Sequence, residues 1–94
     1  MPKILVADDN PTVRATIAAA LEATGHEVTQ AADGGEAAAA LAAGPFDLLV
    51  TDLEMPILGG LDLLQKVVSS PRPIPVIMVS GTWTRAEKHR AKTI

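Results

Sequence analysis

"DLLVTDLEMP" occupies residues 47–56 and decides the fold. Its apolar run from Leu48 to Val50 leads within two residues into Asp52. A short, nearly continuous apolar run is typical of a strand that is covered on both faces of a parallel sheet. The strand is therefore predicted to deliver a carboxylate to its carboxyl end, the edge at which open parallel sheets bind ligands.

The rest of the chain alternates strand and helix patterns around this segment. Strands are predicted at residues 3–7, 27–31 and 76–79. Asn10 and Asp33 can cap two helices, and Gly59-Gly60 precedes a third. A fourth, polar helix is predicted after Thr82 or Thr84, through residues 87–92. This order predicts an α/β fold of parallel βαβ units with right-handed crossovers.

In the third predicted helix, Leu61, Leu64 and Val68 recur on one face. This spacing indicates a helix with one apolar face.

Composition and length indicate a single domain and argue against nucleic-acid-binding and membrane-spanning proteins. The 94 residues suit one domain over 1–94, and there is no cysteine. A net charge of -3 disfavours direct nucleic-acid binding through charge. No apolar run reaches the roughly 20 residues of a membrane span, and the N-terminus does not match a signal peptide. We expect a cytoplasmic protein that binds neither nucleic acid nor membrane.

Acidic and hydroxyl side chains follow three of the predicted strands. Asp8 and Asp9 end the first strand, Asp52 ends the third, and Ser80 ends the fourth. Crowded carboxylates repel one another, and Mg²⁺ relieves that repulsion. A carboxylate at this edge could also act as a nucleophile and form an aspartyl-phosphate.

A strand-end carboxylate also has simpler explanations. A single aspartate at a strand end is more often a turn residue or a cap, but three together favour a site. Glu54 is expected to point to solvent and offer its backbone carbonyl. No His or Cys pair has zinc-ligand spacing. Gly59-Gly60 is interpreted as a flexible turn that enters a helix.

Three stretches together resemble the receiver domain of bacterial two-component response regulators. They are "ILVADDN" at 4–10, "LLVTDLEMPILGG" at 48–60 and "IPVIMVSGT" at 74–82. The resemblance implies a flavodoxin-like, doubly wound parallel sheet, here with strand order 2-1-3-4.

The resemblance also implies a role for each site residue. Asp52 would accept the phosphoryl group, and Ser80 would be the switch hydroxyl. Asp9 would bind Mg²⁺ directly, Asp8 through water, and Glu54 through its backbone carbonyl. The donor would be a phosphohistidine on a sensor histidine kinase or a histidine phosphotransfer protein. The domain itself would not be an enzyme.

The chain departs from the family pattern at its end. Gly81 stands where alanine is usual, and the sequence stops at Ile94, inside the predicted fourth helix. The fifth strand, the fifth helix and the family lysine are therefore expected to be lacking. Strand 76–79 would then lie at the sheet edge, which predicts a homo-oligomer through this strand or the C-terminal helix. The alternative is a marginally stable monomer.

Three functions follow from these observations. The first is a phosphoacceptor in two-component (phosphorelay) signalling. The second is a phosphorylation-incompetent, self-associating interaction module of receiver ancestry. The third, an Mg²⁺-dependent phosphohydrolase, is disfavoured because no second acid or base is placed as a general catalyst.

Overall fold

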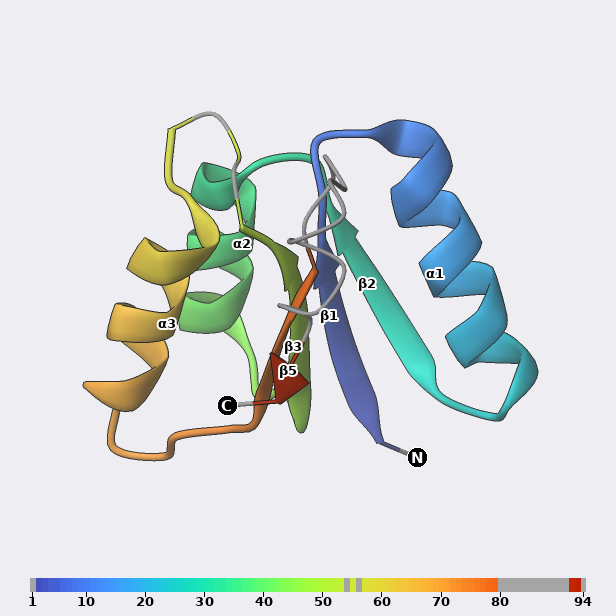
Figure 1. Ribbon diagram of the computed structural model, residues 1–94. Helices are drawn as coiled ribbons and strands as arrows, with labels where there is room; N and C mark the ends of the chain where they lie inside the picture. Colours follow the sequence, from blue (N-terminus) through green and yellow to red (C-terminus); the bar gives the residue numbers. More distant parts are fainter. Residues whose placement is uncertain (1, 54, 56, 80–91, 94) are drawn as a thin grey trace.

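One sheet lies between two layers of helices in the computed structural model, which describes residues 2–53, 55, 57–79 and 92–93. Helix α1 covers one face, and α2 and α3 cover the other (Figure 1). The strands are β1 (Lys3–Ala7), β2 (Glu27–Ala31), β3 (Leu48–Asp52), β4 (Val76–Val79) and β5 (Lys92–Thr93), and the helices are α1 (Pro11–Ala23), α2 (Gly34–Ala43) and α3 (Gly60–Val68). The first four strands are parallel in the order β2-β1-β3-β4, which confirms the predicted flavodoxin-like topology.

Strand β1 is central, and both of its faces are buried. Leu5 and Ala7 belong to the larger core cluster, on the side of α2 and α3, whereas Ile4 and Val6 belong to the smaller cluster under α1. Side chains alternate between the faces of a strand, so a continuous apolar run fills both layers. This burial on both faces explains the uninterrupted hydrophobicity of the strand.

Two helices begin at the caps that the sequence predicts. The Asn10 side chain accepts hydrogen bonds from the amides of Thr12 at 2.9 Å and Val13 at 3.1 Å. The Asp33 side chain accepts one from the Glu36 amide at 2.8 Å. These bonds satisfy amides that have no partner within the helix. None of the helices in the described ranges is long and apolar enough to cross a bilayer.

The face that helix α3 buries overlaps only in part with the apolar face noted in the sequence. Leu63 and Val67 are buried, whereas Leu61 is 63% and Val68 is 55% exposed. Of the three residues on the apolar face noted in the sequence, Leu64 is partly buried against the larger core cluster. The buried set, Gly60, Leu63 and Val67, has the same spacing shifted by one residue, and Gly60 packs closely against the Asp52 backbone.

The outer edge of β4 also differs from the prediction. The short strand β5 pairs antiparallel with β4 and aligns Thr93 with Ile77 and Lys92 with Met78. Lys92 therefore lies in a strand, not in the predicted fourth helix, and β4 is not the free edge from which self-association was predicted. The rest of that predicted helix falls within 80–91, outside the described residues. Self-association stays a prediction.

Candidate functional site

Three carboxylates meet at the carboxyl ends of β1 and β3. The candidate ligand oxygens of Asp8, Asp9 and Asp52 all lie within 4.8 Å of one another. The register explains this proximity, because Ala7 pairs with Thr51 in the parallel β1–β3 ladder. The residues that follow this pair, Asp8 and Asp52, are then neighbours across the sheet.

Two of these carboxylates are buried. Asp8 is 2% and Asp52 is 4% exposed, whereas Asp9 is exposed. The Asp8 carboxylate accepts a hydrogen bond from the Asn10 amide at 2.8 Å. The Arg14 guanidinium donates to the Asp8 backbone carbonyl at 2.8 Å. The site is thus an acidic cluster of two buried carboxylates and one exposed carboxylate.

The pKa of Asp8 is raised above its ordinary value of 3.8. Burial is the largest cause, because it disfavours the charged form. The Asn10 amide opposes this shift, and the charges of Asp52 and Asp9 add to it, whereas Arg14 lowers the pKa. Without a cation the site therefore disfavours negative charge on Asp8, and a bound cation would remove that penalty.

The backbone around Asp52 is held from two sides. The next amide, of Leu53, donates to the Val79 carbonyl at 2.9 Å, and the Leu53 carbonyl accepts from the Gly60 amide at 2.9 Å. Gly60 is the buried first residue of α3, and a Cβ there would collide with the Asp52 carbonyl oxygen. Gly60 is therefore a close-packing position and not merely part of a flexible turn, as the sequence had suggested.

Two other predicted site residues, Glu54 and Ser80, lie outside the described part of the chain. Their neighbours are described: Leu53 precedes Glu54, and Val79, which precedes Ser80, pairs with Asp52 in the β3–β4 register. The predicted roles of Glu54 and Ser80 stay predictions.

Sequence reasoning missed Arg14. This residue lies in the first turns of α1, where its guanidinium also donates to Gln30 of β2 at 3.3 Å. Neither its type nor its spacing signals a contact with the Asp8 backbone. The contact arises because α1 packs beside β1 and β2.

Comparison with known proteins assigns the family. The sequence pattern of the response regulator receiver domain matches residues 4–94. The chain belongs to this family. This receiver domain is 39% identical over 90 residues to a gliding motility regulatory protein of Myxococcus xanthus, and 43% identical over 87 residues to a protein-glutamate methylesterase/protein-glutamine glutaminase of Agrobacterium fabrum.

Solved structures agree with this assignment. A chemotaxis response regulator of Vibrio cholerae superposes with a TM-score of 0.82 at 30% identity, over 95% of the receiver domain and 76% of that chain. A Thermotoga maritima response regulator, solved in complex with Mg²⁺-BeF, gives a TM-score of 0.81 at 30% identity, over 87% of the receiver domain and 71% of that chain.

The receiver domain spans a small part of its curated relatives. It covers 94% of its own length but 12% of the Myxococcus protein, and 90% of its own length but 24% of the Agrobacterium protein. The methylesterase and glutaminase activities are named for the whole Agrobacterium protein.

Proposed function

We propose that this receiver domain accepts a phosphoryl group on Asp52 from a phosphohistidine of a sensor histidine kinase or a histidine phosphotransfer protein. The observation that carries the proposal is the position of Asp52, a buried carboxylate at the tip of β3 within 4.8 Å of two further carboxylates. In the proposed step, an Asp52 oxygen attacks phosphorus and the O–P bond forms. The N–P bond breaks at the same time, and its electron pair returns to the imidazole nitrogen.

The donor set suits Mg²⁺. Mg²⁺ prefers oxygen ligands and binds through one or two carboxylates together with water and phosphate oxygens. Asp9 is exposed and would be a direct ligand with Asp52, whereas Asp8 would bind through water. When bound, Mg²⁺ neutralises negative charge on the transferring phosphoryl group. We further propose that the Glu54 backbone carbonyl completes the ligand set.

Ser80 is the proposed switch hydroxyl. The proposal is supported by the residue before Ser80, Val79, which pairs with Asp52 in the β3–β4 register. A serine hydroxyl can donate a hydrogen bond to a phosphoryl oxygen. This bond would link phosphorylation to a change in the segment that follows β4.

Intact mass after incubation with Mg²⁺ and acetyl phosphate tests the phosphoacceptor. We expect one added phosphoryl group that Asp52→Asn abolishes. Asp47→Asn, at an exposed position away from the acidic site, is the matched control and should label like the parent chain. A folded parent chain that gains no mass would contradict the proposal and favour the interaction module.

Thermal unfolding at matched ionic strength tests the metal separately. A ligand that binds only the folded chain raises the melting temperature. We expect MgCl₂ to raise it above the value in NaCl, and Asp9→Asn to weaken this effect. An equal response of the parent chain and Asp9→Asn would exclude Asp9 as a ligand.

A further inference from the structure

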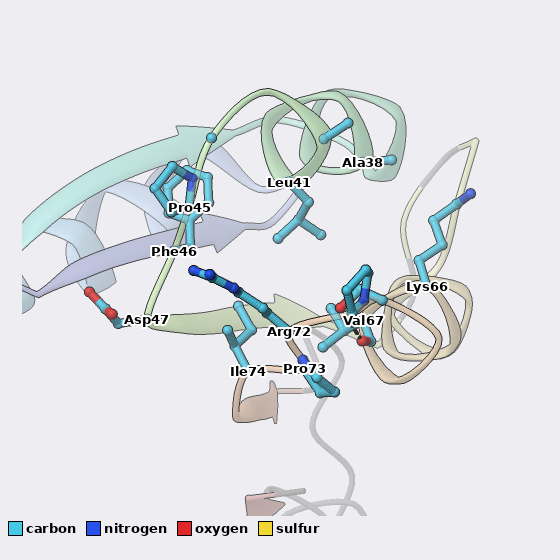
Figure 2. A pocket seen from close by; sticks show the side chains of 14 residues that line it. Ala38, Leu41, Pro45, Phe46, Asp47, Lys66, Val67, Arg72, Pro73 and Ile74 are labelled. Atoms are coloured by element: carbon cyan, nitrogen blue, oxygen red, sulfur yellow. Dashed lines mark hydrogen bonds between the residues drawn. The ribbon is translucent and has the colours of Figure 1, made fainter.

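A hollow of about 830 Å³ lies at the opposite end of the sheet from the acidic site. It lies between the C-terminal halves of α2 and α3, and the segments that lead into β3 and β4 form the rest of its lining (Figure 2). This volume is within the range of about 300–1,000 Å³ that is typical of small-molecule sites. The hollow is separate from the proposed phosphorylation chemistry, which lies at the carboxyl ends of the strands.

The wall of the hollow is apolar. Leu41, Phe46 and Ile74 are half-buried and pack against the larger core cluster, to which Val67 itself belongs. Each of these four residues lines the hollow. They come from α2, from α3 and from the two segments before β3 and β4, so the surface exists only in the folded chain. A ligand with an apolar body would remove the remaining exposed part of these side chains from water.

The charged side chains around the hollow favour an anion. Lys66 and Arg72 line it and are exposed. Among the described residues, Lys3 and Glu27 form an ion pair. Neither Lys66 nor Arg72 has an ion-pair partner among these residues. The lining carboxylate, Asp47, accepts the Lys3 amide at 2.7 Å.

The view in Figure 2 distinguishes the two cations. The Arg72 side chain lies across the hollow with its guanidinium directed toward Phe46, whereas Lys66 extends away from it. The Asp47 carboxylate also points away from the apolar wall. A guanidinium matches a carboxylate with two parallel hydrogen bonds, so Arg72 is the residue placed to bind an anionic head group.

We propose that this hollow binds a small amphipathic carboxylate. Its apolar body would lie on Leu41, Phe46, Val67 and Ile74, and its carboxylate would pair with Arg72. The hollow is concave and of limited volume, which favours a small molecule over a segment of a partner protein. This inference does not depend on phosphorylation of Asp52.

A titration of the ¹⁵N-labelled chain with decanoate, below the concentration at which it forms micelles, tests the site by NMR. We expect saturable shifts of amides in 38–47 and 66–74. Acetate carries the head group alone, and decyltrimethylammonium carries the same body with the opposite charge, so both should bind much more weakly. Equal affinity for decanoate and the cation, or shifts that do not cluster around the hollow, would overturn the proposal.

Three variants localise the interaction. Arg72→Gln should weaken decanoate binding by about two- to fivefold, because it removes an ion pair at an exposed position. Lys3→Gln removes one exposed cation outside the hollow and should leave the affinity unchanged. Ala42→Leu adds bulk at an exposed lining position of α2 and should reduce binding without unfolding the chain. If Arg72→Gln binds as tightly as Lys3→Gln, Arg72 is not the anchor and the proposal fails.

Discussion

Gly60 packs directly against the backbone of Asp52, so closely that any side chain at residue 60 would collide with the Asp52 carbonyl oxygen. The Gly60 amide also donates to the Leu53 carbonyl at 2.9 Å. The first turn of α3 is thereby fixed to the end of β3. The start of α3 thus packs against the proposed phosphoacceptor, whose backbone is also held by the hydrogen bond from the Leu53 amide to the Val79 carbonyl.

Gly60→Ala is expected to lower the free energy of unfolding by about 1–3 kcal/mol, because the added methyl group must displace backbone. Gly44→Ala is the matched control, since a Cβ at Gly44 meets nothing within 4 Å and its φ of -155° is open to any residue. In urea denaturation it should not lower the unfolding free energy and should raise it by up to about 1 kcal/mol, because alanine reduces the entropy of the unfolded chain. Equal losses from both substitutions would show that the contact between Gly60 and Asp52 is not the cause.

The two faces of α3 differ in a way that mutation can measure. Leu63 is fully buried, and Leu63→Ala should cost about 2–5 kcal/mol of unfolding free energy. Leu61 is 63% exposed, so Leu61→Ala should cost less than about 0.5 kcal/mol. If Leu61 and Val68 faced the core instead, the order of these two losses would be reversed, so the same pair of urea curves decides between the two rotations of the helix.

Asp8 should make the stability of the metal-free chain depend on pH. The pKa of Asp8 is raised above its ordinary value of 3.8 in the folded chain. At a pH between the ordinary pKa and the raised pKa, the folded chain therefore binds more protons than the unfolded chain. The free energy of unfolding therefore falls as the pH rises through that window. At neutral pH, without divalent cations, Asp8→Asn should raise the free energy of unfolding. This gain should disappear at a pH below the ordinary pKa, where the Asp8 carboxyl of the parent chain is as neutral as the asparagine of the variant.

Chemical denaturation of Asp8→Asn in EDTA across the acid range measures this dependence. Glu22→Gln, at an exposed position on α1, controls for the loss of one negative charge. It should stay within about 0.5 kcal/mol of the parent chain. The assigned direction of the pKa shift would be contradicted if Asp8→Asn were less stable than the parent chain at neutral pH, or if its gain in unfolding free energy grew as the pH falls.

Ile57 has a left-handed backbone conformation, with a φ of 73°, and its side chain is 79% exposed. This conformation is costly for a β-branched residue, whereas asparagine tolerates it. Ile57→Asn should therefore raise the unfolding free energy by about 0.5–1 kcal/mol, since little packing is lost.

Val68→Asn is the comparison for Ile57→Asn. Val68 is also β-branched and 55% exposed, but it has helical geometry at the end of α3. Val68→Asn should raise neither the melting temperature nor the free energy of unfolding in urea. A loss of stability in Ile57→Asn would mean that the Ile57 side chain contributes more through its contacts than its backbone conformation costs.

The sequence alone predicted the features that depend on local chemistry. Continuous apolar runs predicted buried parallel strands, Asn10 and Asp33 predicted helix starts, and the position of Asp8 and Asp52 after two strands predicted their meeting. Each of these predictions rests on residue type, periodicity or the general rule that parallel strands end at one edge. The meeting of Asp8 and Asp52 joins two remote segments, but it follows from the parallel sheet and needs no further detail of packing.

Tertiary structure decided what depends on the detail of packing. Leu61 and Leu63 are equally apolar, and the packing of α3 against the core and against the Asp52 backbone leaves Leu63 buried and Leu61 exposed. The bond from Arg14 to the Asp8 carbonyl and the pairing of β5 with β4 likewise join remote parts of the chain. Hydrophobic patterns give the period of a helix but leave its rotation open when two apolar faces overlap, and packing against the sheet then selects one.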